Sequence, residues 1–250
     1  MKKNNENLNK MCRRTFVNLS GSATLGAAIS LLKPAGVNAF FSGCPNPPIL
    51  PGYIPSIASA WIRRGTHESS YETFKKTIEA ATDFSWLSQG DNVFLKLSLN
   101  SGISFPATTD PWLLKCMIKL MYEKGAKKVL VGDQSGAEYV VLSRYIKRGS
   151  SRKLCSKAGL LDVIVRNGAQ PVFFEENGYY DYFSVMPPKP HHWPKPLYIT
   201  KKLKQFDHII YLPRVGAHVL ADFSAGMKIA VGFLRDDSRL VMHNGGKNFY

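Results

Sequence analysis

The chain has 250 residues, of which 44% are hydrophobic, so it can bury a core of one domain and is globular rather than disordered. Its 33 Lys and Arg against 18 Asp and Glu give a formal charge of +15, which favours anionic partners through long-range attraction. Residues 1–39 carry six of the basic residues and one acidic residue, and the remainder still carries +10.

The first 39 residues have the order of regions of an export signal. A basic region ends in MCRRTFVNL and is followed by a mildly apolar run, SGSATLGAAISLL, which is too short for a comfortable membrane span. Arg13-Arg14-Thr15-Phe16 resembles the twin-arginine signal, and Val37-Asn38-Ala39 offers modest side chains to a signal peptidase. We predict a twin-arginine signal peptide over 1–39, the twin-arginine translocase as a partner, and a periplasmic or exported protein.

Two alternatives to this leader stay open. An amphipathic N-terminal helix could contain an arginine pair by chance, or Phe41-Ser42-Gly43-Cys44 could be a lipoprotein box that anchors the protein through a lipid on Cys44. Twin-arginine export carries folded proteins and often implies a cofactor inserted beforehand, which the sequence leaves unknown. The spacing of the four cysteines matches neither zinc nor iron–sulfur motifs, so we expect no metal site.

The pattern of elements predicts an α/β domain over 57–250, preceded by a Pro-rich arm over 40–56. A helix is expected over 69–84 and a strand at VFLKLSL. Thr109 or Asp110 then caps a helix that has Pro111 in its first turn and ends at Gly125. The next strand, KKVLVGD, completes a strand–helix–strand unit that fits a right-handed parallel crossover. We predict a mostly parallel sheet flanked by helices in three layers.

The second half of the chain continues with less regular signals. Helices are expected over 136–147 and 151–166, followed by strands at PVFFEE and FDHIIYLP. Between these strands, residues 179–196 form a long insertion rich in Pro and aromatic residues, which predicts a lid or a surface loop. The chain ends abruptly after HNGGKNFY, and we expect it to be truncated there.

Polar side chains follow three of the predicted strands, and in open α/β sheets ligands bind beyond the carboxyl ends of strands. These side chains are Ser98 with Asn100, Asp133 with Gln134 and Ser135, and Arg214 with His218. Neither GxGxxG nor GxxxxGK[ST] is present in its structural context, so a classical dinucleotide site and a P-loop are not supported.

The apolar segment 211–234 carries Arg214, His218, Asp222 and Lys228, which predicts that it lines a cleft. Arg214 and Lys228 would hold a carboxylate or phosphate, together with Asn100, Asp133 and Ser135, and His218 would act as the catalytic acid or base. The alternative is an Arg214–Asp222 ion pair beside a structural histidine.

Several short motifs occur in a characteristic order between Asp91 and His243. They are K-x-S-x-N, T-T-D-P, V-G-D-x-S-G, I-x-x-L-P-R-x-x-x-H, x-x-G-x-K and D-x-R-x-x-x-H. Their order resembles the family called domain of unknown function 362. Members of that family typically have P-K-x-K-x-H and a Lys-Asn pair, where this chain has Arg214, Gly216 and Ile229. Some relatives carry iron–sulfur segments, which the cysteine spacing here does not provide.

Two functions remain as hypotheses. One is an enzyme or cofactor-dependent protein of the cell envelope that acts on a small anionic ligand. The other is a non-catalytic binding or assembly protein that docks an acidic partner. His191-His192 forms a poor metal chelate, and the basic run from Lys147 to Lys157 indicates a solvated helix face rather than contact with nucleic acid.

Overall fold

The computed structural model describes residues 16–18, 57–60, 67–189, 191, 193–218 and 222–243. The chain divides into two compact units, one made of Met1–Gly21, Phe84–Pro187 and His192–Tyr250, the other of Ser22–Asp83 and Pro188–His191. The second unit contains helix α2 (His67–Ala81), close to the predicted range. The predicted boundaries after residues 39 and 56 lie outside the described residues. No helix in the described ranges is long and apolar enough to cross a membrane.

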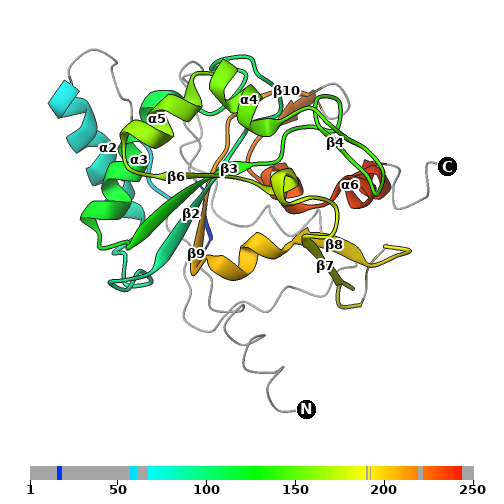
Figure 1. Cartoon of the computed structure of the whole chain (residues 1–250). Coiled ribbons are helices and arrows are strands. Elements are labelled where there is room, and N and C mark those ends of the chain that lie inside the picture. The colour runs from blue at the N-terminus through cyan, green and yellow to red at the C-terminus, as the bar shows by residue number, and fades with distance from the viewer. Residues whose placement is uncertain are drawn as a thin grey trace. The chain divides into compact units, whose positions relative to one another are not determined.

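A five-stranded parallel sheet forms the centre of the larger unit (Figure 1). The strand order is β1-β9-β2-β3-β6, with β1 at Phe16–Asn18, β9 at His208–Leu212, β2 at Asn92–Leu97, β3 at Lys128–Asp133 and β6 at Gln170–Phe173. This confirms the predicted α/β class. Strand β1 lies within the predicted leader, which stays a prediction.

Helices cover one face of this sheet and a smaller layer covers the other (Figure 1). On the first face lie α3 (Pro111–Glu123), α4 (Ser151–Lys157) and α5 (Leu160–Arg166). The second face carries an aromatic cluster in which the Phe94 ring stacks on Phe206 at 4.3 Å. The 3-10 helices η2 (Phe174–Asn177), η3 (Lys201–Gln205) and η4 (Met227–Phe233) supply this layer together with α6 (Asp236–His243).

The start of α3 ties the ends of two strands together. Asp110 is its N-cap, since its carboxylate accepts from the Trp112 N–H at 2.9 Å. Thr109 has a different role: its hydroxyl accepts from the Ser98 N–H at 2.8 Å and donates to the Leu212 carbonyl at 3.1 Å. The hydroxyl therefore links the carboxyl ends of β2 and β9.

Two predictions on the segment after β3 need correction. The predicted helix over 136–147 is wrong, because this segment forms the hairpin β4 (Val141–Leu142) and β5 (Lys147–Arg148). The Leu142 N–H donates to the Asp236 carboxylate at 2.6 Å, which replaces a helical hydrogen bond. The predicted helix over 151–166 is interrupted, because Gly159 adopts φ 77° between α4 and α5.

The long insertion contains regular structure. Strand β7 (Tyr182–Val185) pairs antiparallel with β8 (Leu197–Thr200), and this hairpin packs on the aromatic face of the sheet. Residues 190 and 192, between the two strands, lie outside the described part. The two cysteines that the structure describes are free and buried, as predicted for Cys116. Burial raises the pKa of Cys116 to about 11 and that of Cys155 to about 12, so neither is a ready nucleophile.

Candidate functional site

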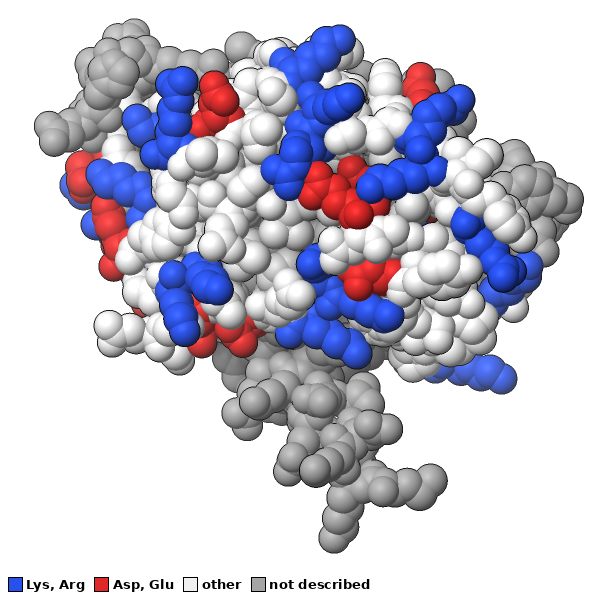
Figure 2. All heavy atoms as spheres, in the orientation of Figure 1, with Lys and Arg blue, Asp and Glu red and all other residues white. Residues whose placement is uncertain are grey.

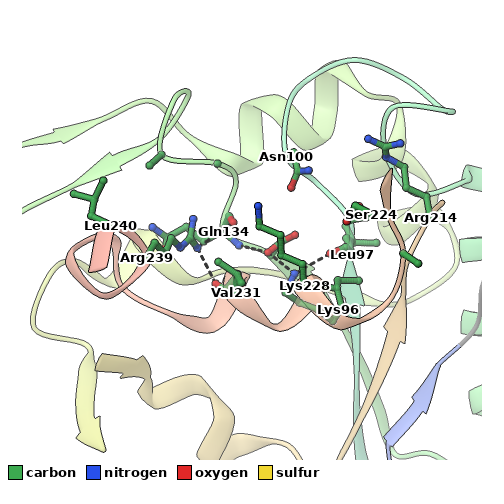
Figure 3. A pocket seen from close by; sticks show the side chains of 17 residues that line it. Lys96, Leu97, Asn100, Gln134, Arg214, Ser224, Lys228, Val231, Arg239 and Leu240 are labelled. Carbon is green, nitrogen blue, oxygen red and sulfur yellow. Dashed lines mark hydrogen bonds and ion pairs between the residues drawn. The ribbon is translucent and has the colours of Figure 1, made fainter. Parts of the chain in front are cut away.

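A cavity of about 240 Å³ lies at the carboxyl ends of β2, β3 and β9 (Figure 3). Parallel strands bring their carboxyl ends to one edge of the sheet, and the chain after β9 returns through η4 and α6 to close the space. Its polar lining consists of Lys96, Ser98, Asn100, Asp133, Gln134, Arg214, Ser224, Lys228 and Arg239.

The wall of the cavity contains a buried ion pair. Lys96 is the last residue but one of β2, and Asp133 ends the neighbouring strand β3. Their Nζ and Oδ1 atoms lie 2.5 Å apart, and both side chains are at most 5% exposed. The Lys96 ammonium also donates to the Leu97 carbonyl at 2.8 Å. The carboxylate accepts from the N–H groups of Leu99 at 3.1 Å and Gln134 at 2.7 Å. Both charges are therefore compensated by hydrogen bonds as well as by each other.

Burial acts on both members of this pair. It lowers the pKa of Lys96 and raises the pKa of Asp133, while the opposite charge of each partner acts against that effect. Whether the proton lies on Lys96 or on Asp133, the pair as a whole carries no net charge. The electrostatic character of the cavity is thus set by the other charged groups of its lining.

Gly232 allows η4 to approach the Lys96–Asp133 ion pair closely. A Cβ on Gly232 would overlap the Asp133 Oδ1 atom and would lie 2.6 Å from both Cε and Nζ of Lys96. The Phe233 ring follows, with its centroid 5.7 Å from the Lys96 ammonium. Helix η4 can therefore lie over the ion pair only with glycine at position 232.

Arg239 on α6 fixes the walls of the cavity. Its Nε donates to the Leu234 carbonyl at 2.8 Å and its Nη1 to the Ser135 carbonyl at 2.7 Å. Its Nη2 reaches the carbonyls of Gly232 at 2.9 Å and Gln134 at 3.2 Å. Most of its donors are thus used for structure, so we expect Arg239 to shape the site rather than to grip a ligand.

A second buried carboxylate supports this arrangement. Asp236 accepts from the Gln134 side chain at 2.9 Å, and the Gln134 amide oxygen accepts from the Tyr182 hydroxyl at 2.6 Å. Burial raises the pKa of Asp236, whereas its hydrogen bond from the Leu142 N–H and the charge of Arg239 lower it. The network connects α6, the β4–β5 hairpin and β7 to the loop after β3.

Arg214 and Lys228 supply the remaining cations. Arg214 follows β9, and its buried Nε has no hydrogen-bond partner among the described residues. Lys228 lies on η4, where burial lowers the pKa of its ammonium group. Asn100 lies near both in the cavity wall (Figure 3). Two cations and a side-chain amide are the donors that a carboxylate, sulfate or phosphate requires.

Of the six site residues predicted from the sequence, the structure brings four to this cavity: Asn100, Asp133, Arg214 and Lys228. Ser135 does not line it, because its side chain is buried next to the Arg239 network, where its hydroxyl has no partner among the described residues. His218 belongs to β10 (Gly216–His218), opposite Asp222 of β11 (Asp222–Ser224). The side chains of His218 and Asp222 lie outside the described part of the chain, so the structure does not test an Arg214–Asp222 ion pair.

Sequence reasoning missed Lys96, Gln134, Gly232 and Arg239 as site residues. Lys96 begins the K-x-S-x-N motif and Arg239 occupies the D-x-R motif, so their positions in ordered motifs were the available signal. Gln134 stands in the polar turn after a predicted strand, which was its only signal. Gly232 carried none, because its importance arises only from the groups that the fold places beside it.

The weaker candidates give no second site. No group of three metal-ligating side chains occurs among the described residues, which include His191 but not its neighbour at 192. In the basic run after β5, Arg152 forms two hydrogen bonds with the Glu176 carboxylate, at 2.7 and 2.9 Å.

A family model described as a domain of unknown function (DUF362) matches residues 93–249, more than half of the chain. The chain belongs to the DUF362 family. Every residue that lines the cavity lies within the DUF362 segment. Searches of curated proteins and of solved structures found no match.

One departure from the usual DUF362 pattern has a structural explanation. Arg214 and Gly216 stand where the family typically has two lysines, and a Cβ on Gly216 would overlap the Arg214 guanidinium. The larger arginine therefore occupies space that a side chain at position 216 would need.

The close approach of Gly232 can be tested by adding one methyl group. Gly232→Ala should lower the free energy of unfolding by about 3 kcal/mol or more, because it displaces one partner of a buried ion pair. Urea unfolding measures this change. Gly136→Ala is the control, since its Cβ would meet only the Asn100 carbonyl, at 3.4 Å, in the same cavity. Equal stability of the two variants would contradict the proposed packing.

Proposed function

We propose that this DUF362 domain binds a small anionic ligand in the cavity beyond β2, β3 and β9. The observation that carries the proposal is the charge of the lining: four cations, Lys96, Arg214, Lys228 and Arg239, against the single carboxylate of Asp133. Since Lys96 and Asp133 cancel, Arg214, Lys228 and Arg239 give the lining an excess of positive charge, although Asp236, which does not line the cavity, lies 4.0 Å from Arg239. Such a site attracts anions and rejects cations.

Arg214 and Lys228 are proposed as the groups that contact the ligand. Arg239 already donates to four backbone carbonyls, whereas the Arg214 Nε is buried without a partner in the described part of the chain. The Asn100 amide, on the loop after β2, would add a neutral donor. A bound anion would satisfy the Arg214 Nε and would raise the lowered pKa of Lys228.

Catalysis is the further part of this proposal. His218 would serve as the acid or base, because it follows β9 on the same segment as Arg214 and its backbone pairs with that of Asp222. A bound cofactor of unknown identity is compatible with this role. We also propose that the protein is exported through the twin-arginine pathway, on the basis of Arg13-Arg14 and the apolar run behind them.

A non-catalytic docking function is the second candidate. Figure 2 shows Lys and Arg side chains distributed over most of the visible face, with only small groups of Asp and Glu among them. An acidic partner would find complementary charge over such a face. Docking would not require an enclosed cationic cavity, so the cavity favours the ligand-binding function.

Sulfate serves as a probe of the cavity. Arg214→Gln and Lys228→Gln should each weaken sulfate binding about 10- to 100-fold, because each removes a charged hydrogen bond to the anion. Isothermal titration calorimetry measures the affinity, and thermal melting should change little. Lys127→Gln removes an exposed charge from the β3 side and should leave sulfate affinity unchanged. An equal loss in this control would show that sulfate senses only net charge.

The affinity for sulfate should also depend on pH. Burial lowers the pKa of Lys228, so its ammonium is lost at a lower pH than that of an ordinary lysine, and sulfate affinity should fall as pH rises through that value. Sulfate remains a dianion over this pH range, so a fall in affinity would come from a change in the charge of the protein. Lys228→Arg keeps the charge at high pH and should abolish the fall. A fall with the same midpoint in Lys228→Arg would assign it to another group.

Export can be tested separately from ligand binding. Changing Arg13→Lys and Arg14→Lys should leave the precursor in the cytoplasm, because the twin-arginine pathway reads the guanidinium pair. Cell fractionation measures this outcome, and efficient export of the variant would remove the twin-arginine proposal. Mass spectrometry of the exported protein distinguishes cleavage after Ala39 from the alternative, an acylated Cys44.

A further inference from the structure

The β4–β5 hairpin presents an exposed tip that the cavity does not use. The exposed segment 144–148, called the 144–148 tip below, consists of Arg144, Tyr145 and Ile146 of the turn and of Lys147 and Arg148 of β5. Tyr145 is 86% exposed and Ile146 is 59% exposed, two large apolar side chains side by side in the chain. None of the five residues lines the cavity.

The hairpin is anchored to the rest of the domain through Leu142. Leu142 is buried, and its N–H donates to the Asp236 carboxylate. The Ser143 N–H donates to the Ile146 carbonyl at 2.8 Å, and the Ser143 hydroxyl accepts from the N–H groups of Tyr145 and Ile146. The backbone and Ser143 thus set the shape of the turn, and the exposed side chains of the tip are not needed to form it.

The tip is strongly cationic. Three of its five residues are Lys or Arg, and no acidic residue occurs between Tyr139 and Leu161. Lys147 donates to the backbone carbonyl of Glu176 at 3.3 Å, whereas the Glu176 carboxylate is taken by Arg152. The positive charge of the 144–148 tip is therefore not neutralised by acidic residues close to it in the sequence.

We propose that the 144–148 tip binds the anionic phospholipid headgroups of a membrane surface, with Tyr145 and Ile146 entering the interface between the headgroups. Aromatic side chains prefer this depth, and aliphatic ones gain from burial below it, while lysine and arginine contact the lipid phosphates. The contact lies on the membrane and does not span it. The proposal does not depend on the anion-binding function of the cavity.

The small size of the tip favours a lipid surface over a protein partner. Stable protein interfaces use about 20–30 residues on each side, and five residues at the end of a hairpin fall far short of this. A membrane needs no matching shape, so a few apolar side chains and cations contribute to binding individually. Nucleic acid would use the cations and the Tyr145 ring but would gain little from the aliphatic Ile146.

Vesicle co-sedimentation of the full 250-residue chain tests the apolar contribution. Binding to phosphatidylcholine vesicles that contain phosphatidylglycerol should exceed binding to pure phosphatidylcholine and should weaken about tenfold in the Tyr145→Ser/Ile146→Ser variant. The control is Ile103→Ser/Val165→Ser, which removes apolar side chains that are 62% and 58% exposed elsewhere. An equal loss in the control, or none in the tip variant, would overturn the proposal.

A charge variant tests the same contact independently. Replacing Arg144, Lys147 and Arg148 with Gln should weaken vesicle binding about fivefold for each charge, whereas replacing the exposed Lys115, Lys119 and Lys127 with Gln should cost much less. Because every variant retains residues 1–39, any binding by the leader is the same in all of them. If the wild-type chain binds a single-stranded oligonucleotide through the tip and ignores anionic vesicles, the lipid proposal is wrong.

Discussion

The buried ion pair between Lys96 and Asp133 is the constraint around which this domain is arranged. Removing two charges from water costs several kcal/mol for each ion, and only close pairing with further hydrogen bonds offsets that cost. The pair meets this condition because β2 and β3 are adjacent and parallel, which places both side chains at one edge of the sheet. The loops after these strands then supply backbone donors to the carboxylate.

The cationic character of the cavity follows from this neutral pair. Since Lys96 and Asp133 cancel, the charges of Arg214 and Lys228 make the lining positive. The guanidinium of Arg239 is held by its hydrogen bonds to backbone carbonyls. Its positive charge therefore attracts an anion from a fixed position. An anion entering the cavity would meet donors that are already in position, which reduces the entropy lost on binding.

The architecture could be predicted from the sequence because the patterns that mark its strands and helices are local. Buried strands such as 128–133 are continuous apolar runs, and Asp110 with Pro111 marks a helix start within a few residues. The hairpin at Val141–Leu142 was mistaken for helix, since the partner of its N–H, Asp236, lies 94 residues away. Strand ends pointed to Asn100, Asp133 and Arg214, and the charges within 211–234 pointed to Lys228. The use of Gly232 depends on contacts that no local pattern encodes.

The hydrogen bonds of Arg239 also determine when the cavity can exist. Its guanidinium reaches the Gln134 and Ser135 carbonyls across 105 and 104 residues, and the Gln134 side chain reaches Asp236 across 102. Contacts of such separation form late in folding, because the entropy of closing a long loop must be overcome first. During synthesis, β2, α3 and β3 emerge from the ribosome about 100 residues before α6. The walls of the cavity must wait until α6 has been made.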